Sequence, residues 1–278
     1  MLLNCGREKL AASPAARLEV EILLAHALES TRSFLYANPE LELPRKRAEQ
    51  FKDLLKRRAG GEPIAYLTGK TEFWSLPLRI SPDVLIPRPE TESVVATALD
   101  KIPPAADWRI ADLGTGSGAI ALALALERPR CEVHGTDISS KAIGIARENA
   151  ARLGLDAVSF HSGNWVAPLA GKFHVIVSNP PYVEAGDPHL DRGDLRFEPA
   201  AALTPGGDGL AAIRQISALA GPLLHAGGWL ILEHGFEQGP AVRHILESDG
   251  FVNIETRRDL AGHERLAAGQ RPRAAMTD

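Results

Sequence analysis

The segment RIADLGTGSGAIALALA, Arg109–Ala125, passes from a short apolar run through a loop with three glycines into an apolar stretch of helical length. Gly114, Gly116 and Gly118 lack a Cβ atom, so the backbone can turn sharply there and a ligand can approach it closely. A strand that enters a helix through such a loop is typical of nucleotide-binding α/β sheets. The same glycines also suit tight packing between a strand and a helix, and the pattern alone does not separate the two interpretations.

Downstream of Trp108, short apolar runs alternate with segments of helical length. The runs of strand length are RIADLG, CEVHGTDIS, AVSFHSGNW, FHVIVSNPPY and GGWLILEHG. Strands that are buried on both faces read as continuous apolar runs, and their alternation with helices predicts a parallel sheet. The segment VNIETRRDLAGHERLAAGQ predicts two further strands joined by a turn, at least one of them antiparallel. The expected fold is α/β, a doubly wound, mostly parallel, seven-stranded Rossmann-like sheet.

The first 70 residues have a different pattern. Apolar side chains recur at helical spacing over Pro14–Leu28 and again over Pro44–Arg58, which predicts two helices. We expect a small helical domain over residues 1–70. The residues of the second helix that should face inward are Phe51, Leu54 and Leu55.

A connector follows this helical domain. The segment TEFWSLPLRISPDVLIPRPETE has β-forming residues interrupted by prolines, which predicts a β-hairpin connector over 71–88. We expect a helix to begin at Glu90, where acidic residues suit the helix dipole. The α/β domain is then expected to fill 89–278.

Composition favours an enzyme-like globular protein, since apolar residues make up 45% and charged residues 24% of the chain. The net charge of −4 is unevenly shared: residues 1–70 carry 12 Lys and Arg against 9 Asp and Glu, and the other 208 residues carry 19 against 26. Wrapping bare nucleic acid requires a concentrated cationic surface. The acidic main body therefore argues against direct binding of nucleic acid.

The start of the chain and the cysteines give two further expectations. Arg7, Glu8 and Lys9 interrupt the apolar stretch that a secretory signal needs, and no run reaches membrane-spanning length. We therefore expect a cytoplasmic protein without membrane contact. Cys5 and Cys131 stand apart from other metal-ligating residues, which predicts two reduced thiols and no metal site.

Acidic and aromatic residues after the strands refine the expected ligand. Asp137, in HGTDIS, can accept hydrogen bonds from both ribose hydroxyls of an adenosine-containing cofactor, each worth about 1.5–3 kcal/mol. NAD and S-adenosylmethionine share that ribose. Asp112 favours S-adenosylmethionine, because a carboxylate suits the cationic methionine end better than a pyrophosphate; an acid that only braces the loop is the alternative. Trp165, after Asn164, could flank an adenine ring or simply fill the core.

The fourth apolar run ends in SNPPY, Ser178–Tyr182. Proline fixes its own φ and holds the preceding residue extended, so this segment should leave the sheet as a stiff arm without two of its N–H donors. Its carbonyl oxygens would then face the crevice at the carboxyl ends of the strands, where α/β sheets bind ligands. A plain Pro-Pro loop with Asn179 as a turn former is the alternative.

A planar NH₂ group would fit such an arm. The Asn179 side-chain oxygen can accept one hydrogen and the Pro180 carbonyl the other, while Tyr182 covers the flat face of the substrate. The lone pair of such a nitrogen is delocalised, so orientation must supply much of the catalysis, and alignment of two reactants is worth about 7–11 kcal/mol. No metal or covalent nucleophile is required.

Taken together, DLGTGSGAIALALA, TDIS and SNPPY resemble class I S-adenosylmethionine-dependent methyltransferases that act on planar nitrogens. YLTGKTEFWSLPLRISPDVLIPRPETE, RFEPAAAL, GGDGL, GGWLILEHG and DLAGHERLAAGQ extend the resemblance to the HemK/PrmC family, the protein-(glutamine-N5) methyltransferases of peptide-chain release factors. The resemblance implies S-adenosyl-L-methionine as cofactor, S-adenosyl-L-homocysteine as product and the glutamine of a Gly-Gly-Gln loop as acceptor. It also implies that the helical N-terminal domain helps to dock the release factor, and we expect a monomer.

The resemblance also assigns residues. At the cofactor it places Gly114, Thr115, Gly116, Ser117, Gly118, Asp137, Trp165 and Asn179. At the glutamine amide it places Asn179, Pro180, Pro181 and Tyr182, with Asn179, Pro180 and Tyr182 as the catalytic residues. The family often has Asp where this chain has Asn164, which bears on cofactor affinity. Four other polar residues are left outside the site: Glu233 and His234 as a pair that braces a turn, and Arg196 and Glu198 as a local ion pair.

Three other functions remain open from the sequence. A nucleic-acid methyltransferase would also use SNPPY, because an exocyclic adenine amine is a planar NH₂ group, but the acidic body argues against it. A nicotinamide oxidoreductase would explain the glycine loop and leave SNPPY unexplained. A silent binding module that docks through its basic N-terminal helix is the third possibility.

Overall fold

The computed structural model describes residues 10, 13–190, 193–259 and 261–273. The chain divides into two compact units, each described here by itself. The N-terminal unit comprises Met1–Lys70 and Asp191–Phe197, and the second unit comprises Thr71–Leu190 and Glu198–Asp278. Arg7, Glu8, Lys9 and Cys5 lie outside the described residues, and Cys131 is a free thiol.

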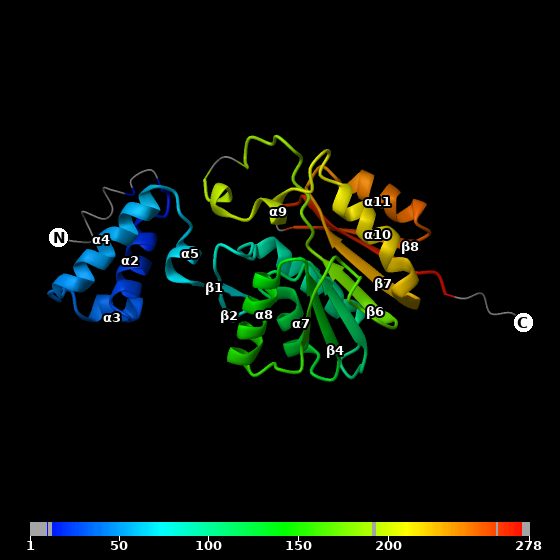
Figure 1. Cartoon of the computed structure of the whole chain (residues 1–278), viewed down its shortest axis with the longest axis horizontal. Helices are drawn as coiled ribbons and strands as arrows, with labels where there is room; N and C mark the ends of the chain where they lie inside the picture. The colour runs from blue at the N-terminus through cyan, green and yellow to red at the C-terminus, as the bar shows by residue number, and fades with distance from the viewer. Residues whose placement is uncertain (1–9, 11–12, 191–192, 260, 274–278) are drawn as a thin grey trace, which may run out of the picture. The chain divides into compact units, whose positions relative to one another are not determined.

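The N-terminal unit is helical (Figure 1). It contains α2 (Ala16–Ala27), α3 (Arg32–Ala37), α4 (Arg45–Ala59) and α5 (Ile64–Thr68). The two long helices confirm the periodicity of the sequence, whereas α3 is too short to give a clear repeat. A single apolar cluster holds the helices together, and its members include Leu23, Leu24, Phe51, Leu54, Leu55 and Leu67. The inward orientation expected for the residues of α4 is confirmed.

The helical unit also contains ion pairs that join its helices and its second segment. Glu21 is buried on α2 and accepts hydrogen bonds from Arg17 at 3.0 Å and Arg32 at 2.8 Å. Burial opposes ionisation of Glu21, but these arginines outweigh it and lower its pKa to about 2. Arg58 donates to Glu19 at 2.9 Å and to Asp194 at 2.8 Å, which joins the second segment of the unit to its helices.

A hairpin comes next along the chain. Strands β1 (Lys70–Phe73) and β2 (Leu76–Arg79) form a two-stranded sheet. The two residues between them, Trp74 and Ser75, have φ values of 52° and 59°, which is the backbone of a type I′ turn built without glycine. The Trp74 amide donates to Glu92 at 2.9 Å, so the turn is anchored on the helix that follows.

That helix, α6 (Glu92–Lys101), begins two residues later than expected. A 3-10 turn, η1 (Pro89–Thr91), precedes it. Proline supplies no N–H and fixes φ, so it suits the first turn of a helix. The expected start at Glu90 is therefore wrong by two residues, and Thr91 lies in the tighter turn, buried with 3% of its surface exposed.

The second unit is built on a seven-stranded sheet of order β5-β4-β3-β6-β7-β9-β8. The strands are β3 (Arg109–Leu113), β4 (Glu132–Asp137), β5 (Ser159–Ser162), β6 (Phe173–Ser178), β7 (Leu224–Glu233), β8 (Val252–Arg258) and β9 (Glu264–Gln270). Strands β3 to β7 are parallel to one another, and β9 is antiparallel to both β7 and β8. The doubly wound, mostly parallel sheet and its antiparallel end are confirmed.

Helices cover both faces of this sheet. Figure 1 shows α7 (Ala119–Glu127) and α8 (Ser140–Leu153) on one side, and α10 (Ala211–Leu223) and α11 (Gly239–Ser248) on the other. Two shorter elements, η2 (Leu195–Phe197) and α9 (Ala200–Leu203), lie between β6 and α10 in the sequence. Because alternate residues of a strand face opposite sides, Ile110 joins one apolar cluster and Ala111 the other.

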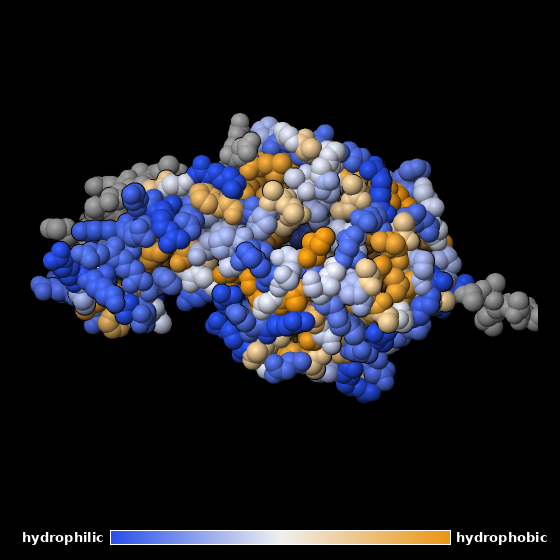
Figure 2. Space-filling model, viewed as in Figure 1, coloured by the Kyte–Doolittle hydropathy of each residue, from blue (hydrophilic) through white to orange (hydrophobic). Residues whose placement is uncertain are grey.

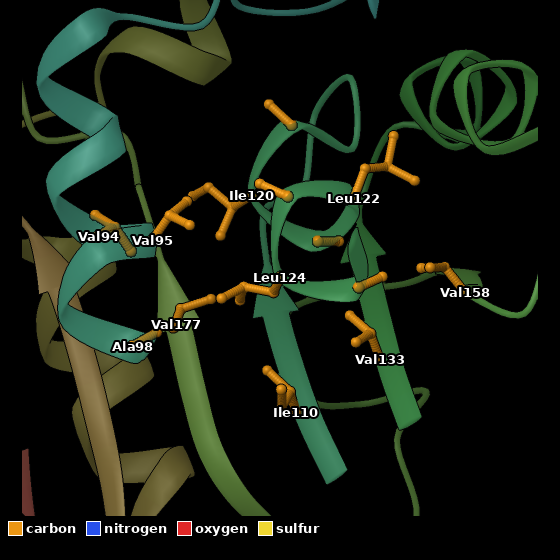
Figure 3. Close-up of a cluster of buried hydrophobic side chains, with 14 of the residues drawn as sticks. Val94, Val95, Ala98, Ile110, Ile120, Leu122, Leu124, Val133, Val158 and Val177 are labelled. Carbon is orange, nitrogen blue, oxygen red and sulfur yellow. The ribbon is translucent and has the colours of Figure 1, made fainter. Parts of the chain in front are cut away.

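The first cluster is packed around α7, whose residues from Ala119 to Ala125 are all buried. Figure 3 shows side chains of α6 and α7 against β3, β4 and β6. The labelled side chains include Val94, Val95 and Ala98 of α6, Ile120, Leu122 and Leu124 of α7, and Ile110, Val133 and Val177 of the three strands. A helix that is apolar all round must be buried, so the helix after the glycine loop is fixed firmly to the sheet. No described helix is both long and apolar enough to span a membrane.

Candidate active site

The sheet order places two loops side by side at the carboxyl ends of β3 and β6. After β3 the chain adds β4 and β5 on one side, and later β6 and β7 on the other, so the winding direction reverses between β3 and β6. This reversal is the point at which α/β sheets bind ligands. Leu113 pairs with Ser178 across it, and the Ser178 hydroxyl donates to the Leu113 carbonyl at 2.6 Å. Gly114 directly follows the end of β3, and Asn179 directly follows the end of β6.

The glycine loop has the backbone that only glycine adopts easily. Gly114, Gly116 and Gly118 have φ values of 73°, 55° and 85°, all in the left-handed region. The amides of Gly114 and Thr115 both donate to the Thr136 carbonyl at 2.8 Å, which fixes the loop to β4. A Cβ atom on Gly116 would meet nothing within 4 Å, so the loop faces open space at that position.

Thr115, Ser117 and Asp112 are buried, and hydrogen bonds to them brace this loop. Thr115 Oγ1 donates to Asp112 Oδ2 at 2.6 Å, and the Ala121 amide donates to the same oxygen at 3.2 Å. The Ser117 carbonyl accepts from Asn149 at 2.9 Å. Burial, against these hydrogen bonds, raises the pKa of Asp112 to about 7. The bracing role that the sequence left open for Asp112 is therefore what the structure shows, and the Thr115 hydroxyl is directed at Asp112.

Asp137 ends β4 directly beside the loop. Its Oδ2 accepts from the Gly116 amide at 2.9 Å and its Oδ1 from the Ser139 amide at 2.8 Å. Burial raises its pKa, against these two hydrogen bonds. Each carboxylate oxygen has further lone pairs, so Asp137 can still accept the hydroxyls of a ribose.

Trp165 reaches the loop from the segment after β5. A Cβ atom on Gly114 would lie 3.3 Å from the Trp165 ring, and the indole Nε1 donates to Gln215 at 2.8 Å. The backbone of Trp165 has a φ of 44°, an uncommon value for a bulky residue. Asn164 is exposed beside it. Three strand ends thus bring an open glycine loop, a carboxylate and an aromatic ring together, and this set of residues fits a nucleoside.

The SNPPY arm supplies acceptors on the other side of the reversal. Asn179 Nδ2 donates to Thr91 Oγ1 at 3.0 Å. In the described part of the chain no group donates to Asn179 Oδ1 or to the Pro180 carbonyl. The Tyr182 carbonyl, in contrast, accepts from Gln238 at 2.9 Å. Pro180 is buried and Pro181 half-buried, so the stiff arm holds the two open acceptors in place.

Glu233 is the residue whose place the sequence did not predict. It ends β7, next to β6 in the sheet, with 1% of its surface exposed, and its Oε1 accepts from the Tyr182 hydroxyl at 3.1 Å. Burial raises its pKa to about 7, against the lowering effect of the nearby Thr91 and Tyr182 hydroxyls. Its neighbour His234 donates a hydrogen bond through Nδ1 to the Gly235 carbonyl of the turn, at 2.8 Å. Only His234 therefore fits the expected bracing of a turn.

The ion pair expected between Arg196 and Glu198 is wrong. Glu198 instead pairs with Arg88 and accepts from the Ile86 amide at 3.1 Å. Arg196 donates to the Gly60 carbonyl. Sequence proximity suggested a local pair, but the two side chains are directed to segments more than a hundred residues earlier in the chain.

Comparison with known proteins assigns the chain to a family. Residues 1–69 match the family described as PrmC N-terminal domain, and residues 93–217 match the methyltransferase small domain. The release factor glutamine methyltransferase of Vibrio cholerae is 51% identical over 260 residues, which cover 93% of this chain and 90% of that protein. The one from Pseudomonas aeruginosa is 50% identical over 260 residues, which cover 93% and 94%.

A solved structure shares the fold. A 16S rRNA methyltransferase of T. thermophilus, in complex with AdoMet and guanosine, has a TM-score of 0.55 and 17% identity, and the match covers 73% of this chain and 49% of that one. At this identity the likeness concerns the fold alone. The identity and coverage of the two bacterial relatives, in contrast, show that the chain belongs to the release factor glutamine methyltransferase family.

Proposed function

We propose that the protein transfers a methyl group from S-adenosylmethionine to the side-chain amide nitrogen of the glutamine in the Gly-Gly-Gln loop of peptide-chain release factors. The observation that supports this most directly is the pair of open acceptors on the SNPPY arm, Asn179 Oδ1 and the Pro180 carbonyl. A primary amide has two N–H donors in one plane. The arm begins beside the glycine loop, so an amide held there lies next to the proposed cofactor.

The cofactor would be held at the glycine loop. Gly114, Gly116 and Gly118 allow close approach, Asp137 would accept the ribose hydroxyls, and Trp165 would lie beside the adenine. The side chain of Thr115 and the backbone carbonyl of Ser117 would support the loop from behind. When bound, S-adenosylmethionine supplies an electrophilic methyl group on a positively charged sulfur.

The catalytic contribution of the chain would be orientation. Asn179 Oδ1 accepts one amide hydrogen and the Pro180 carbonyl the other, so the plane of the amide is fixed. The lone pair of an amide nitrogen is delocalised, and correct alignment of such a weak nucleophile is worth about 7–11 kcal/mol. Pro180 and Pro181 keep the arm from relaxing, and Tyr182 covers the flat face of the glutamine side chain.

The substrate class is supported by the relatives, which are named release factor glutamine methyltransferases. The proposed division of labour gives docking of the release factor to residues 1–70, the connection to 71–88 and the chemistry to 89–278. The protein would act as a monomer, without direct binding of nucleic acid. Because release factors act in translation, the proposed activity belongs to the cytoplasm.

Mass mapping tests the proposal directly. The full chain is incubated with labelled S-adenosylmethionine and either a release factor or DNA, and the modified residue is then located. We expect label only on the glutamine of the Gly-Gly-Gln loop, and none when that glutamine is replaced by alanine. Label on an adenine amine, with none on the release factor, would replace this proposal with the nucleic-acid alternative.

A further inference from the structure

The indole ring of Trp165 has a neighbour at each of its two ends. At one end, Nε1 donates a hydrogen bond to Gln215 Oε1 on α10 at 2.8 Å. At the other end, Cζ3 lies so close to the glycine loop that a Cβ atom on Gly114 would be 3.3 Å from it. The ring therefore extends from α10 to the loop at which we place the cofactor.

Apolar packing alone does not fix the orientation of this ring. Trp165 is half-buried against the apolar cluster on the α10 side of the sheet, but apolar contacts have no preferred direction. Its backbone, with a φ of 44°, is in a region that is uncommon for a bulky residue. A hydrogen bond does select an orientation, because the indole has its single N–H donor on one edge. The bond to Gln215 therefore decides which edge of the ring faces α10.

Gln215 can hold the ring because α10 is firmly placed. Gln215 itself lies on the exposed side of the helix. The first turn of α10 is tied to the preceding loop by Arg214, which donates to Asp208 at 2.6 Å. The buried side of the helix packs into the same apolar cluster as Trp165, through Ala212, Ile213, Ile216 and Ala220.

We propose that Gln215 is a positioning residue that orients the Trp165 indole for binding of the nucleoside part of S-adenosylmethionine. The inference rests on the proposed function, which places the adenine beside Trp165. Two flat rings attract each other best in a small number of relative orientations, so a ring held in one orientation binds more tightly than a ring that is free to turn. Gln215 acts through the indole N–H and does not touch the cofactor.

A bond that only ties α10 to the segment after β5 would have a different consequence. The Trp165 to Gln215 bond is exposed, and the net contribution of such a bond to stability is small. Loss of a purely structural bond would lower the melting temperature slightly and leave cofactor affinity unchanged. Loss of a positioning bond would weaken cofactor binding in a protein that is still folded.

Four variants of the full chain test the proposal: Gln215→Leu, Gln215→Glu, Trp165→Phe and the double variant that combines Gln215→Leu with Trp165→Phe. Leucine removes the acceptor, and glutamate keeps one at the same place. Gln50→Leu is the matched control, because Gln50 is exposed on α4 and accepts from Arg47 at 3.4 Å. Calorimetry measures the affinity of each protein for S-adenosylhomocysteine, and thermal melting checks that each one folds.

Gln215→Leu should weaken S-adenosylhomocysteine binding about three- to tenfold, the range expected for one hydrogen bond. Gln215→Glu and Gln50→Leu should stay near the wild type. In the Trp165→Phe protein, which has no indole N–H, the further change Gln215→Leu should cost no additional affinity. Wild-type affinity in Gln215→Leu would overturn the proposal, and so would an equal loss from Gln215→Leu in the presence and absence of the indole.

Kinetics give a second readout of the same variant. With a release factor as acceptor, Gln215→Leu should raise the KM for S-adenosylmethionine and leave kcat nearly unchanged, because the lost contact orients the nucleoside rather than the reacting methyl group. A fall in kcat at constant KM would contradict the role assigned to Gln215.

The indole N–H signal of Trp165 in isotope-labelled protein reports the bond whether or not the enzyme turns over. The chain has four tryptophans, so the signal is assigned by its absence in Trp165→Phe. We expect it to move in Gln215→Leu, and a signal that does not move would show that the proposal is wrong. If the wild type binds S-adenosylhomocysteine but leaves the release factor unmethylated, the proposed function fails, and the affinities of the variants still decide the role of Gln215.

Discussion

At the scale of single residues, the candidate site is marked by acceptor atoms that receive no hydrogen bond from the described residues. Asn179 uses its nitrogen for Thr91, and no described residue donates to its oxygen. The Tyr182 hydroxyl donates a hydrogen bond to Glu233. Buried or half-buried polar atoms are normally paired inside a protein, so an open acceptor on a stiff arm indicates a ligand that completes it.

Asn179→Ala should abolish methyl transfer with little effect on S-adenosylmethionine affinity. The expected loss is about 3–4 kcal/mol of transition-state stabilisation, comparable to the removal of one preorganised hydrogen-bonding group. Single-turnover rates measure the loss, and calorimetry measures cofactor binding. An equal loss of cofactor affinity would contradict the role assigned to Asn179.

Glu233 should also make stability depend on pH. Its pKa is raised from 4.5 to about 7 in the folded protein, so the folded state binds its proton more tightly than the unfolded state does. The stabilisation is fully present below about pH 4.5 and is lost as the pH rises through about 7, in total about 3 kcal/mol. Relative to the wild type, Glu233→Gln should therefore gain stability between these pH values. Urea denaturation of both proteins at several pH values measures the difference. If the free energy of unfolding depends on pH in the same way in both proteins, Glu233 does not titrate in this way.

At the scale of secondary-structure elements, the glycine loop is held by close packing as well as by its backbone. A Cβ atom on Gly118 would lie 3.1 Å from Leu122, 3.2 Å from Ala146 and 3.3 Å from Phe160. These contacts join α7, α8 and β5 at one point. The loop therefore tolerates change poorly on its inner side, although it is open at Gly116.

Gly118→Ala should destabilise the protein by about 1–3 kcal/mol, because the φ of 85° strains any other residue and the new methyl group is crowded. Gly144→Ala is the matched control. Gly144 is exposed within α8, where a Cβ atom would meet nothing within 4 Å, so alanine should stabilise the helix by about 0.5–1 kcal/mol. Denaturation midpoints that shift in the same direction for both variants would refute this account.

The elements also show what can be read from sequence and what cannot. The buried strands and α7 were predictable because a continuous apolar run permits few other structures. The turn at Trp74 and Ser75 was not, since both residues have a positive φ without glycine or asparagine to signal it. The position of Thr91 was not predictable either, because its partner Asn179 lies 88 residues away. Glu233 ends a predicted strand, but only the order of the strands places that strand beside β6.

At the scale of the whole molecule, the two units differ in the sign of their net charge. The helical N-terminal unit is net positive, although several of its arginines are held in internal ion pairs. Figure 2 shows hydrophilic residues over much of the visible face of this unit. Lys52 and Lys56 are exposed one turn apart on α4, which leaves two cations on one face of the helix.

Lys52→Glu combined with Lys56→Glu should lower kcat/KM for an intact release factor by about tenfold, because complementary charge steers association of the partner. A short Gly-Gly-Gln peptide should be methylated as before, since it has no remote surface to dock. Substitution of both lysines by arginine is the control, because it keeps the charge. If peptide and protein substrates suffer alike, the N-terminal unit has a structural role rather than a docking role.

The hydrogen bonds between β3 and β6 join parts of the chain that are 65 residues apart, as the Ser178 to Leu113 contact shows. Gly114, Asp137 and Trp165, which we propose to contact the nucleoside, follow β3, β4 and β5, whose pairings are closer in sequence and form at lower entropic cost. During refolding, the ability to bind a nucleoside should therefore return earlier than the ability to methylate a substrate. Catalytic turnover is thus the stricter criterion of a completely folded chain.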